Sequence, residues 1–94
     1  MDLPQNIMNS ISDLACRCNL DKVILFGSRA RGDNRERSDI DLAIQGGDTV
    51  AFAAGVDEDI PTLLMFDVVD LDKPVQKELL DEIRKDGVVI YEKV

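Results

Sequence analysis

The stretch that decides the fold runs from Leu25 to Leu42 and reads LFGSRARGDNRERSDIDL. Its first residues end a short apolar run, residues 22–26, which predicts a strand covered on both faces. Gly27 and Ser28 follow at once and predict a sharp turn into a short helix, with Ser28 as its N-cap. After a polar loop, polar and apolar residues alternate over 39–44, which predicts a second strand with two distinct faces.

Outward from this block, hydrophobic spacing and turn residues predict the remaining elements. We expect helices over 4–18, 48–61 and 72–86, and strands over 63–71 and 88–91. Gly55 weakens the middle helix, and Gly87 stands where a left-handed cap would end the last one. The 94 residues suffice for one domain, residues 1–94. We therefore predict an α/β (α+β) fold, a small mixed sheet of about four strands with helices packed on it.

The charge balance limits the classes of partner. Asp and Glu number 19 against 11 Lys and Arg, which gives a formal net charge of −8. This excess of negative charge argues against a module that binds long nucleic acid through its phosphates. No apolar run approaches the roughly 18 residues of a membrane-spanning helix, and no secretory leader is recognisable. We expect a cytoplasmic protein that binds small ligands or a protein partner.

The cysteine and histidine content restricts the metals that the chain could hold. Cys16 and Cys18 are the only cysteines, and there is no histidine. Two helical residues at this spacing point about 200° apart, so we expect two buried, reduced thiols rather than a disulfide. A zinc site of the usual kind is excluded, and oxygen ligands favour Mg²⁺ or Mn²⁺.

Asp39 and Asp41 are the strongest candidates for metal ligands. On a strand they project from the same face, roughly 7 Å apart along it. Two carboxylates about 4 Å apart repel each other by roughly 4 kcal/mol at an effective dielectric constant of 20. A divalent cation between them would relieve that repulsion. An isolated pair of this kind more often belongs to a half-exposed strand whose polar residues face solvent, so the interpretation depends on the neighbouring Gly27-Ser28 turn.

The turn and the arginines after it predict a phosphate site. Glycine lets the backbone approach a phosphate closely, and a serine hydroxyl adds a donor. Four arginines lie within nine positions of an otherwise acidic chain: Arg29, Arg31, Arg35 and Arg37. Arg31 is our candidate for a nucleotide contact, only slightly favoured over Arg29, and the other two are equally well explained as loop residues balancing nearby acids. A Walker-type loop is excluded because Asp33 stands where its lysine is required.

The block closely resembles the signature of the minimal nucleotidyltransferases of the DNA polymerase β-like superfamily. That signature is a strand, Gly-Ser, ten residues and Asp-x-Asp, as in Gly27-Ser28 and Asp39-Ile40-Asp41 here. The resemblance implies transfer of a nucleoside monophosphate, with ATP as the expected donor, to a hydroxyl group. It also implies two Mg²⁺ ions held by Asp39, Asp41 and a third carboxylate, with Gly27, Ser28 and Arg31 binding the nucleotide.

The resemblance places the third carboxylate on a later strand in an apolar setting. Asp67 and Asp70 both lie in the predicted strand over 63–71, and their odd spacing puts them on opposite faces. We choose Asp67 because it is embedded among apolar residues, where an unpaired charge is costly, whereas Asp70 lies near the strand end and reaches water.

The acceptor is left open by the residues themselves. Minimal proteins of this family resemble antitoxins paired with a HEPN-domain toxin, which implies a protein acceptor. Two alternatives remain: nucleotidyl transfer to a small molecule such as an aminoglycoside, and a nucleotide-binding subunit without turnover. Intact Asp39, Asp41 and Asp67 weigh against the last of these.

Overall fold

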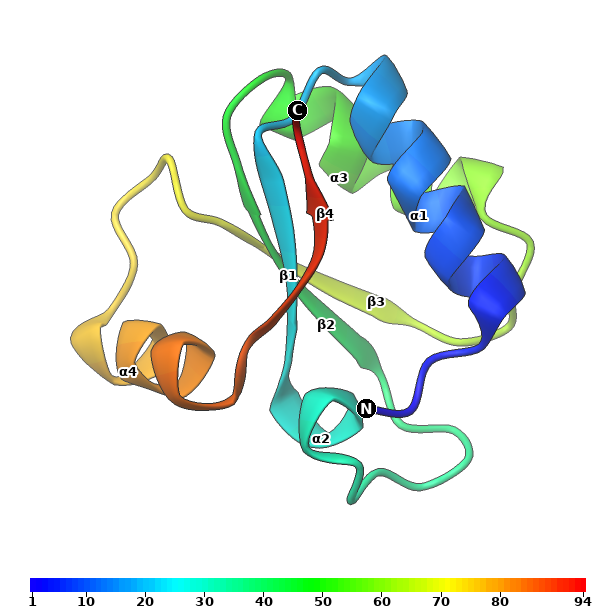
Figure 1. Ribbon diagram of the computed structural model, residues 1–94, viewed down its shortest axis with the longest axis vertical. Coiled ribbons are helices and arrows are strands. Elements are labelled where there is room, and N and C mark those ends of the chain that lie inside the picture. The colour runs from blue at the N-terminus through cyan, green and yellow to red at the C-terminus, as the bar shows by residue number, and fades with distance from the viewer.

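A computed structural model describes residues 1–94 and contains a four-stranded sheet with four helices (Figure 1). The elements in chain order are α1 (Gln5–Arg17), β1 (Lys22–Phe26), α2 (Gly27–Arg31), β2 (Ile40–Gln45), α3 (Thr49–Asp59), β3 (Phe66–Asp70), α4 (Lys77–Asp86) and β4 (Val88–Glu92). The strand order is β3-β2-β1-β4, with β2 and β3 parallel and the other pairs antiparallel. The predicted fold class, a small mixed sheet with packed helices, is confirmed.

The two faces of the sheet carry separate apolar clusters. Figure 1 shows α1 and α3 on one side of the sheet and α4 on the other. The cluster beneath α1 and α3 contains 15 buried residues. Three of its members, Phe52, Leu25 and Leu42, are each 0% exposed. The cluster on the α4 side contains three: Phe26, Ala43 and Ile83. Most of the burial that stabilises the fold therefore lies on the α1 and α3 side.

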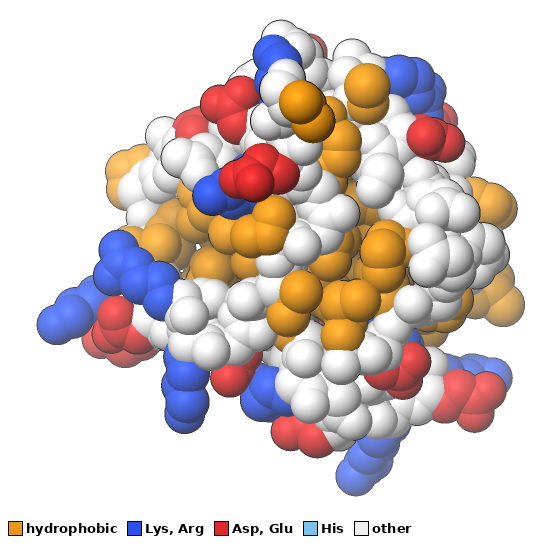
Figure 2. Space-filling model, viewed as in Figure 1, with side chains coloured by type: hydrophobic (Ala, Val, Ile, Leu, Met, Phe, Trp, Pro, Cys, Tyr) orange, Lys and Arg blue, Asp and Glu red, His pale blue; other side chains and the backbone are white.

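On the visible surface, apolar and charged side chains occupy different areas. In Figure 2, apolar side chains occupy the centre of the visible face, where Figure 1 shows β1 and β4, and charged side chains lie mostly around its rim. The edge strand β4 contributes Val88, Ile90 and Tyr91, which are partly buried against the larger cluster. Tyr91 thus packs at the sheet edge. None of the four helices has the length and apolar character needed to span a membrane.

The connection between β2 and β3 fixes how these two strands are aligned. The helix that sequence patterning only weakly supported is present as α3, and Asp48 caps it by accepting a hydrogen bond from the Ala51 amide at 3.0 Å. Gly55 is buried against Leu14 of α1, so the residue that weakens the helix intrinsically also lets the two helices approach. The crossover sets β3 parallel to β2, with Asp41 opposite Asp67.

The predicted starts of β3 and α4 were wrong. The strand begins at Phe66 rather than at residue 63, and Leu63 is fully exposed. The partner strand β2 begins only at Ile40, whose amide donates to the Met65 carbonyl, so residues before Met65 have no strand to pair with. The last helix begins at Lys77, not at residue 72.

The predicted helix ends and thiols need three corrections. Gly87 is extended, with φ −64° and ψ 138°, because β4 begins at the next residue. A side chain there would meet the Ile83 carbonyl and Ile24 Cγ2, so close packing explains this glycine. Cys18 is buried but Cys16 is exposed, because it lies off the buried face of α1. Ser28 is not the N-cap of α2, which follows Phe26 directly.

Candidate active site

The turn after β1 brings the backbone against an aspartate. Gly27 is buried with φ +74°, a conformation that side chains rarely adopt. A Cβ at this position would collide with Oδ2 of Asp41, whose strand position pairs with Phe26. Ser28 lies in the first turn of α2, half-buried, and does not cap the helix. The Gly27-Ser28 turn and Asp41 therefore form one continuous surface.

The sheet register places two of the predicted carboxylates side by side. Asp41 is the second residue of β2 and pairs with Asp67, the second residue of β3. Paired residues of parallel neighbours project from the same face, and adjacent strands lie about 4.8 Å apart. Asp39 lies one residue before β2 rather than within it, and its side chain is exposed. The pairing of β2 with β3 thus brings all three predicted aspartates to one end of two adjacent strands.

The electrostatic environment of Asp41 reflects this crowding. Burial raises its pKa to about 6, and repulsion from Asp67, Asp39 and Glu82 contributes in the same direction. The positive charge of Arg31 opposes the shift. Asp41 is therefore a carboxylate whose negative charge is costly in this position, and a bound cation would stabilise it.

Glu82 is a fourth acidic residue near the site that the sequence analysis did not identify. It belongs to α4, follows Leu79 by three residues and precedes the buried Ile83. Helical spacing therefore puts it at the border of the face that packs on the sheet. This helical spacing was the only sequence signal for Glu82. The helix carries several other acidic residues, so the spacing alone could not single out Glu82.

The donor set fits a divalent cation of the magnesium type. Asp39, Asp41 and Asp67 offer only carboxylate oxygens, the ligands that Mg²⁺ and Mn²⁺ prefer, and Arg31 offsets only part of the cost of a negative charge on Asp41. As the side chains stand, no three acidic or cysteine side chains are arranged so that they could hold a metal ion together. The backbone register pairs Asp41 with Asp67. Coordination of a cation by Asp39, Asp41 and Asp67 together is part of the proposed function.

The two arginines of α2 have different surroundings. Arg31 is partly exposed and contacts three acidic residues, Asp33 at 3.1 Å, Asp86 at 3.2 Å and Glu82 at 4.0 Å. The hydrogen bonds that Arg31 donates to the Asp33 and Asp86 carboxylates raise the pKa of the guanidinium. Arg29, in contrast, is buried and contacts backbone carbonyl groups. Arg31 thus lies beside the acidic site, and its predicted role in binding a nucleotide stays a prediction.

The alternative third carboxylate, Asp70, lies elsewhere. It pairs with Ile44 and so faces the α1 and α3 side, where its carboxylate accepts a hydrogen bond from the Asp72 amide at 2.9 Å. The reason given for choosing Asp67 was nevertheless wrong, because Asp67 is exposed and Asp70 is half-buried. The apolar neighbours of Asp67 in sequence do not enclose it, since β3 is an edge strand.

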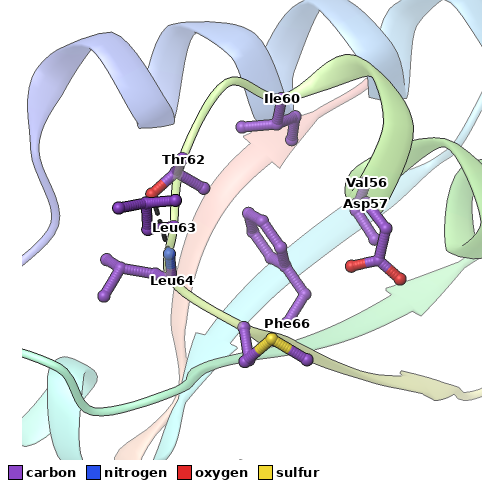
Figure 3. Close-up of a pocket in the computed structure, with 8 residues that line it drawn as sticks. Val56, Asp57, Ile60, Thr62, Leu63, Leu64 and Phe66 are labelled. Carbon is purple, nitrogen blue, oxygen red and sulfur yellow. Dashed lines mark hydrogen bonds between the residues drawn. The ribbon is translucent and has the colours of Figure 1, made fainter.

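One apolar hollow in the surface is separate from the carboxylates. It measures about 310 Å³ and lies between α3 and the segment over 60–66. Figure 3 shows the Phe66 ring pointing into it, with Ile60 and Val56 beside it and the exposed Leu63 on the outer segment. Because Phe66 and Asp67 are neighbours on a strand, they face opposite sides of the sheet. The hollow is therefore on the side away from Asp41 and Asp67.

Residues 9–94 match the family model described as polymerase beta, nucleotidyltransferase. The match spans the Gly27-Ser28 turn, the three aspartates and all four strands. No curated protein resembles the sequence closely enough to count as a relative.

Solved structures with the same fold include toxin–antitoxin proteins. A toxin–antitoxin crystallised with AMP-PNP has a TM-score of 0.64 and 26% identity, covering 92% of this chain and 73% of that one. An MntA-HpeT toxin–antitoxin with two aspartates changed to glutamate has a TM-score of 0.65 and 22% identity, with the same coverage. A nucleotidyltransferase-like protein from Sulfolobus solfataricus has a TM-score of 0.58 and 24% identity, covering 95% of this chain and 79% of that one.

Proposed function

The chain belongs to the polymerase β nucleotidyltransferase family, and from this premise we propose that it transfers AMP from ATP to a hydroxyl group of a partner protein. The observation that carries the proposal is the parallel register that sets Asp67 opposite Asp41, directly beside the Gly27-Ser28 turn. A buried glycine turn suits a polyphosphate, and paired carboxylates suit the cations that accompany it.

In the proposed reaction the hydroxyl oxygen attacks the α-phosphorus of ATP, and the bond to pyrophosphate breaks. Asp39 and Asp41 would hold two Mg²⁺ or Mn²⁺ ions, and Asp67 would complete the second position. Such ions lower the pKa of an attacking hydroxyl and neutralise charge on the leaving group. Asp67, which is exposed at the sheet edge, would also accept the proton that the hydroxyl releases.

The remaining residues of the turn would orient the nucleotide. Gly27 allows the phosphates to approach the backbone, and the Ser28 hydroxyl donates to them. Arg31 would exchange one of its carboxylate partners for a phosphate, since guanidinium groups bind both in the same planar geometry. The chain thus contributes orientation and charge, which account for most of catalysis in phosphoryl-type transfer.

The choice of a protein acceptor rests on the structural neighbour that is a toxin–antitoxin with AMP-PNP. We propose that the acceptor hydroxyl belongs to a toxin partner, with a HEPN-domain protein as the expected class. Because ATP is the donor, we expect the reaction to take place in the cytoplasm.

The direct test incubates the protein with ATP labelled at the α-phosphate, Mg²⁺ and the product of the neighbouring gene. We expect label on that product and a mass increase of one AMP unit. Asp41→Asn should abolish labelling, while Asp70→Asn, the same change on the opposite face, should retain it. Label on an aminoglycoside without a second protein would instead identify a small-molecule acceptor. Partner neutralisation that survives Asp41→Asn would identify a binding subunit without turnover.

A further inference from the structure

Arg29 is the one charged side chain that the fold buries, with 3% of its surface exposed. It takes part in none of the salt bridges of the molecule, although the chain carries 19 acidic residues. A buried guanidinium is costly unless its donors are satisfied. Its partners therefore indicate why the charge is kept in this position.

All three partners of Arg29 are backbone carbonyls from outside α2. The guanidinium donates from Nε to Ser38 at 3.0 Å, from one terminal nitrogen to Glu36 at 3.0 Å, and from the other to Asp2 at 3.2 Å. The Asp2 amide in turn donates to the Arg29 carbonyl at 2.8 Å. One side chain thus joins the segment before α1 to the loop that leads into β2.

This loop delivers Asp39 to the candidate site. The carbonyl of Ser38, directly before Asp39, is held by Arg29, and the amide of Ile40, directly after it, donates to Met65 of the β3 side at 2.9 Å. Asp39 lies outside the strand, so sheet pairing alone does not fix it. Its backbone is anchored on one side by the sheet and on the other by a guanidinium.

We propose that Arg29 is a positioning residue that fixes the backbone before Asp39 and so sets where the Asp39 carboxylate stands relative to Asp41 when a divalent cation binds. The inference rests on the proposed function, because it takes these aspartates as metal ligands. Arginine suits the role because its planar group presents donors in several directions at once. Lysine keeps the charge but presents it at a single nitrogen, which cannot reach three separate carbonyls in the same way.

The test measures Mn²⁺ affinity, through the relaxation of water protons, in the wild-type protein and in Arg29→Lys. Residues that orient metal ligands typically change affinity by about 10- to 100-fold when replaced, and we expect a loss in this range. Arg37→Lys is the matched control, since Arg37 is exposed on the same loop and takes part in none of the salt bridges. We expect its affinity to stay within about twofold of the wild type.

A double-mutant cycle distinguishes positioning of Asp39 from general loosening of the fold. If Arg29 acts through Asp39, Arg29→Lys should weaken Mn²⁺ binding much less in an Asp39→Asn background than in the wild type. Equal losses in both backgrounds, or an affinity within twofold of the wild type in Arg29→Lys alone, would overturn the proposal.

A second measurement requires only the wild-type chain, in case Arg29→Lys does not fold. Hydrogen exchange of the Arg29 Nε–H, followed by NMR, should slow by about tenfold at saturating Mg²⁺, because a cation on Asp39 and the guanidinium stabilise the same loop conformation. Unchanged exchange in a protein that binds Mg²⁺ contradicts the positioning role. Absence of any Mg²⁺ binding contradicts the proposed function itself, so the two failures are distinguishable.

Discussion

The two faces of the sheet differ in what covers them and in the charges they carry. Beneath α1 and α3, 15 apolar residues are buried, whereas the α4 side buries three and leaves Asp41 half-buried among other acids. The first face supplies most of the hydrophobic free energy of folding. The second face carries a repulsive charge cluster that reduces stability. The comparison indicates that the apolar core that stabilises the fold and the acidic residues of the proposed active site lie on opposite faces of one sheet.

The largest expected effect is on activity at the α4 face. Asp41→Asn removes a carboxylate at the centre of the acidic site, and loss of a metal ligand is expected to cost several kcal/mol of transition-state stabilisation, about a thousandfold in rate. Measurement of AMP transfer at saturating ATP and Mg²⁺ checks this. Asp70→Asn serves as control, and comparable losses in both variants would remove the distinction between the faces.

The next largest effect is on stability at the α1 and α3 face. Phe52 is a fully buried member of the larger cluster and the largest such side chain, and Phe52→Ala is expected to lower the free energy of unfolding by about 3–5 kcal/mol. Leu79 is partly buried against the smaller cluster, so Leu79→Ala should cost about half as much or less. Urea unfolding followed by circular dichroism measures both values. A larger loss in Leu79→Ala would reverse the assignment.

Gly27→Ala tests the contact between the turn and Asp41. The positive φ alone costs a side chain about 1–2 kcal/mol, and the collision with the Asp41 carboxylate adds to it. We expect a loss of about 2 kcal/mol in the free energy of unfolding together with loss of ATP binding. Ala30→Gly in the same helix is the comparison variant, expected to lose stability but to retain nucleotide affinity.

The charge cluster predicts an unusual dependence of stability on pH. The pKa of Asp41 lies near 3.8 in the unfolded chain and is raised to about 6 in the fold, so the native state binds more protons between these values. Stability contributed by this group therefore rises as the pH falls from about 7 towards 4. After discounting for solvent screening we expect Asp41→Asn to be about 1–2 kcal/mol more stable than the wild type at pH 7 without metal.

Urea unfolding of the wild type and Asp41→Asn at pH 4 and pH 7 isolates this contribution from other titrating groups. The difference between the two proteins should be largest at pH 7 and should nearly vanish at pH 4. The same difference in the free energy of unfolding at pH 4 and pH 7 would show that the fold does not raise the pKa of Asp41.

The smallest expected effect concerns Arg31, whose ion pairs are partly exposed. Exposed pairs of this kind contribute little to stability because solvent screens them, so Arg31→Gln should leave the free energy of unfolding nearly unchanged. If Arg31 contacts the triphosphate, the same variant should raise the KM for ATP by about tenfold. Steady-state kinetics at varied ATP measure this, with Arg35→Gln as control.

Much of this arrangement was predictable because alternation and helical spacing encode which residues are buried. The alternating residues over 39–44 identified β2 and its acidic face. The Gly27-Ser28 turn was predictable because a glycine directly after an apolar strand favours a sharp turn. The pairing of Asp41 with Asp67 was not encoded locally, since it depends on the crossover through α3. The exposure of Asp67 was also missed, because an edge strand lacks a neighbour to cover it.

The role of Arg29 had no readable signal. Its partners are backbone carbonyls of Asp2, Glu36 and Ser38, and a carbonyl is present at every residue whatever the side chain. Sequence alone ranked Arg29 almost level with Arg31, although one is buried and the other is paired with acids at the surface. Only the path of the loop distinguishes them.

The parallel pairing of β2 with β3 has a consequence for engineering the protein. Hydrogen bonds between the strands, and not the length of the connection, hold Asp67 opposite Asp41. The exposed Leu63 lies in the part of that connection outside helix and strand, so extra residues inserted there leave the strand alignment intact. This position is therefore suited to grafting a reporter peptide or a recognition loop without disturbing the alignment of Asp41 with Asp67.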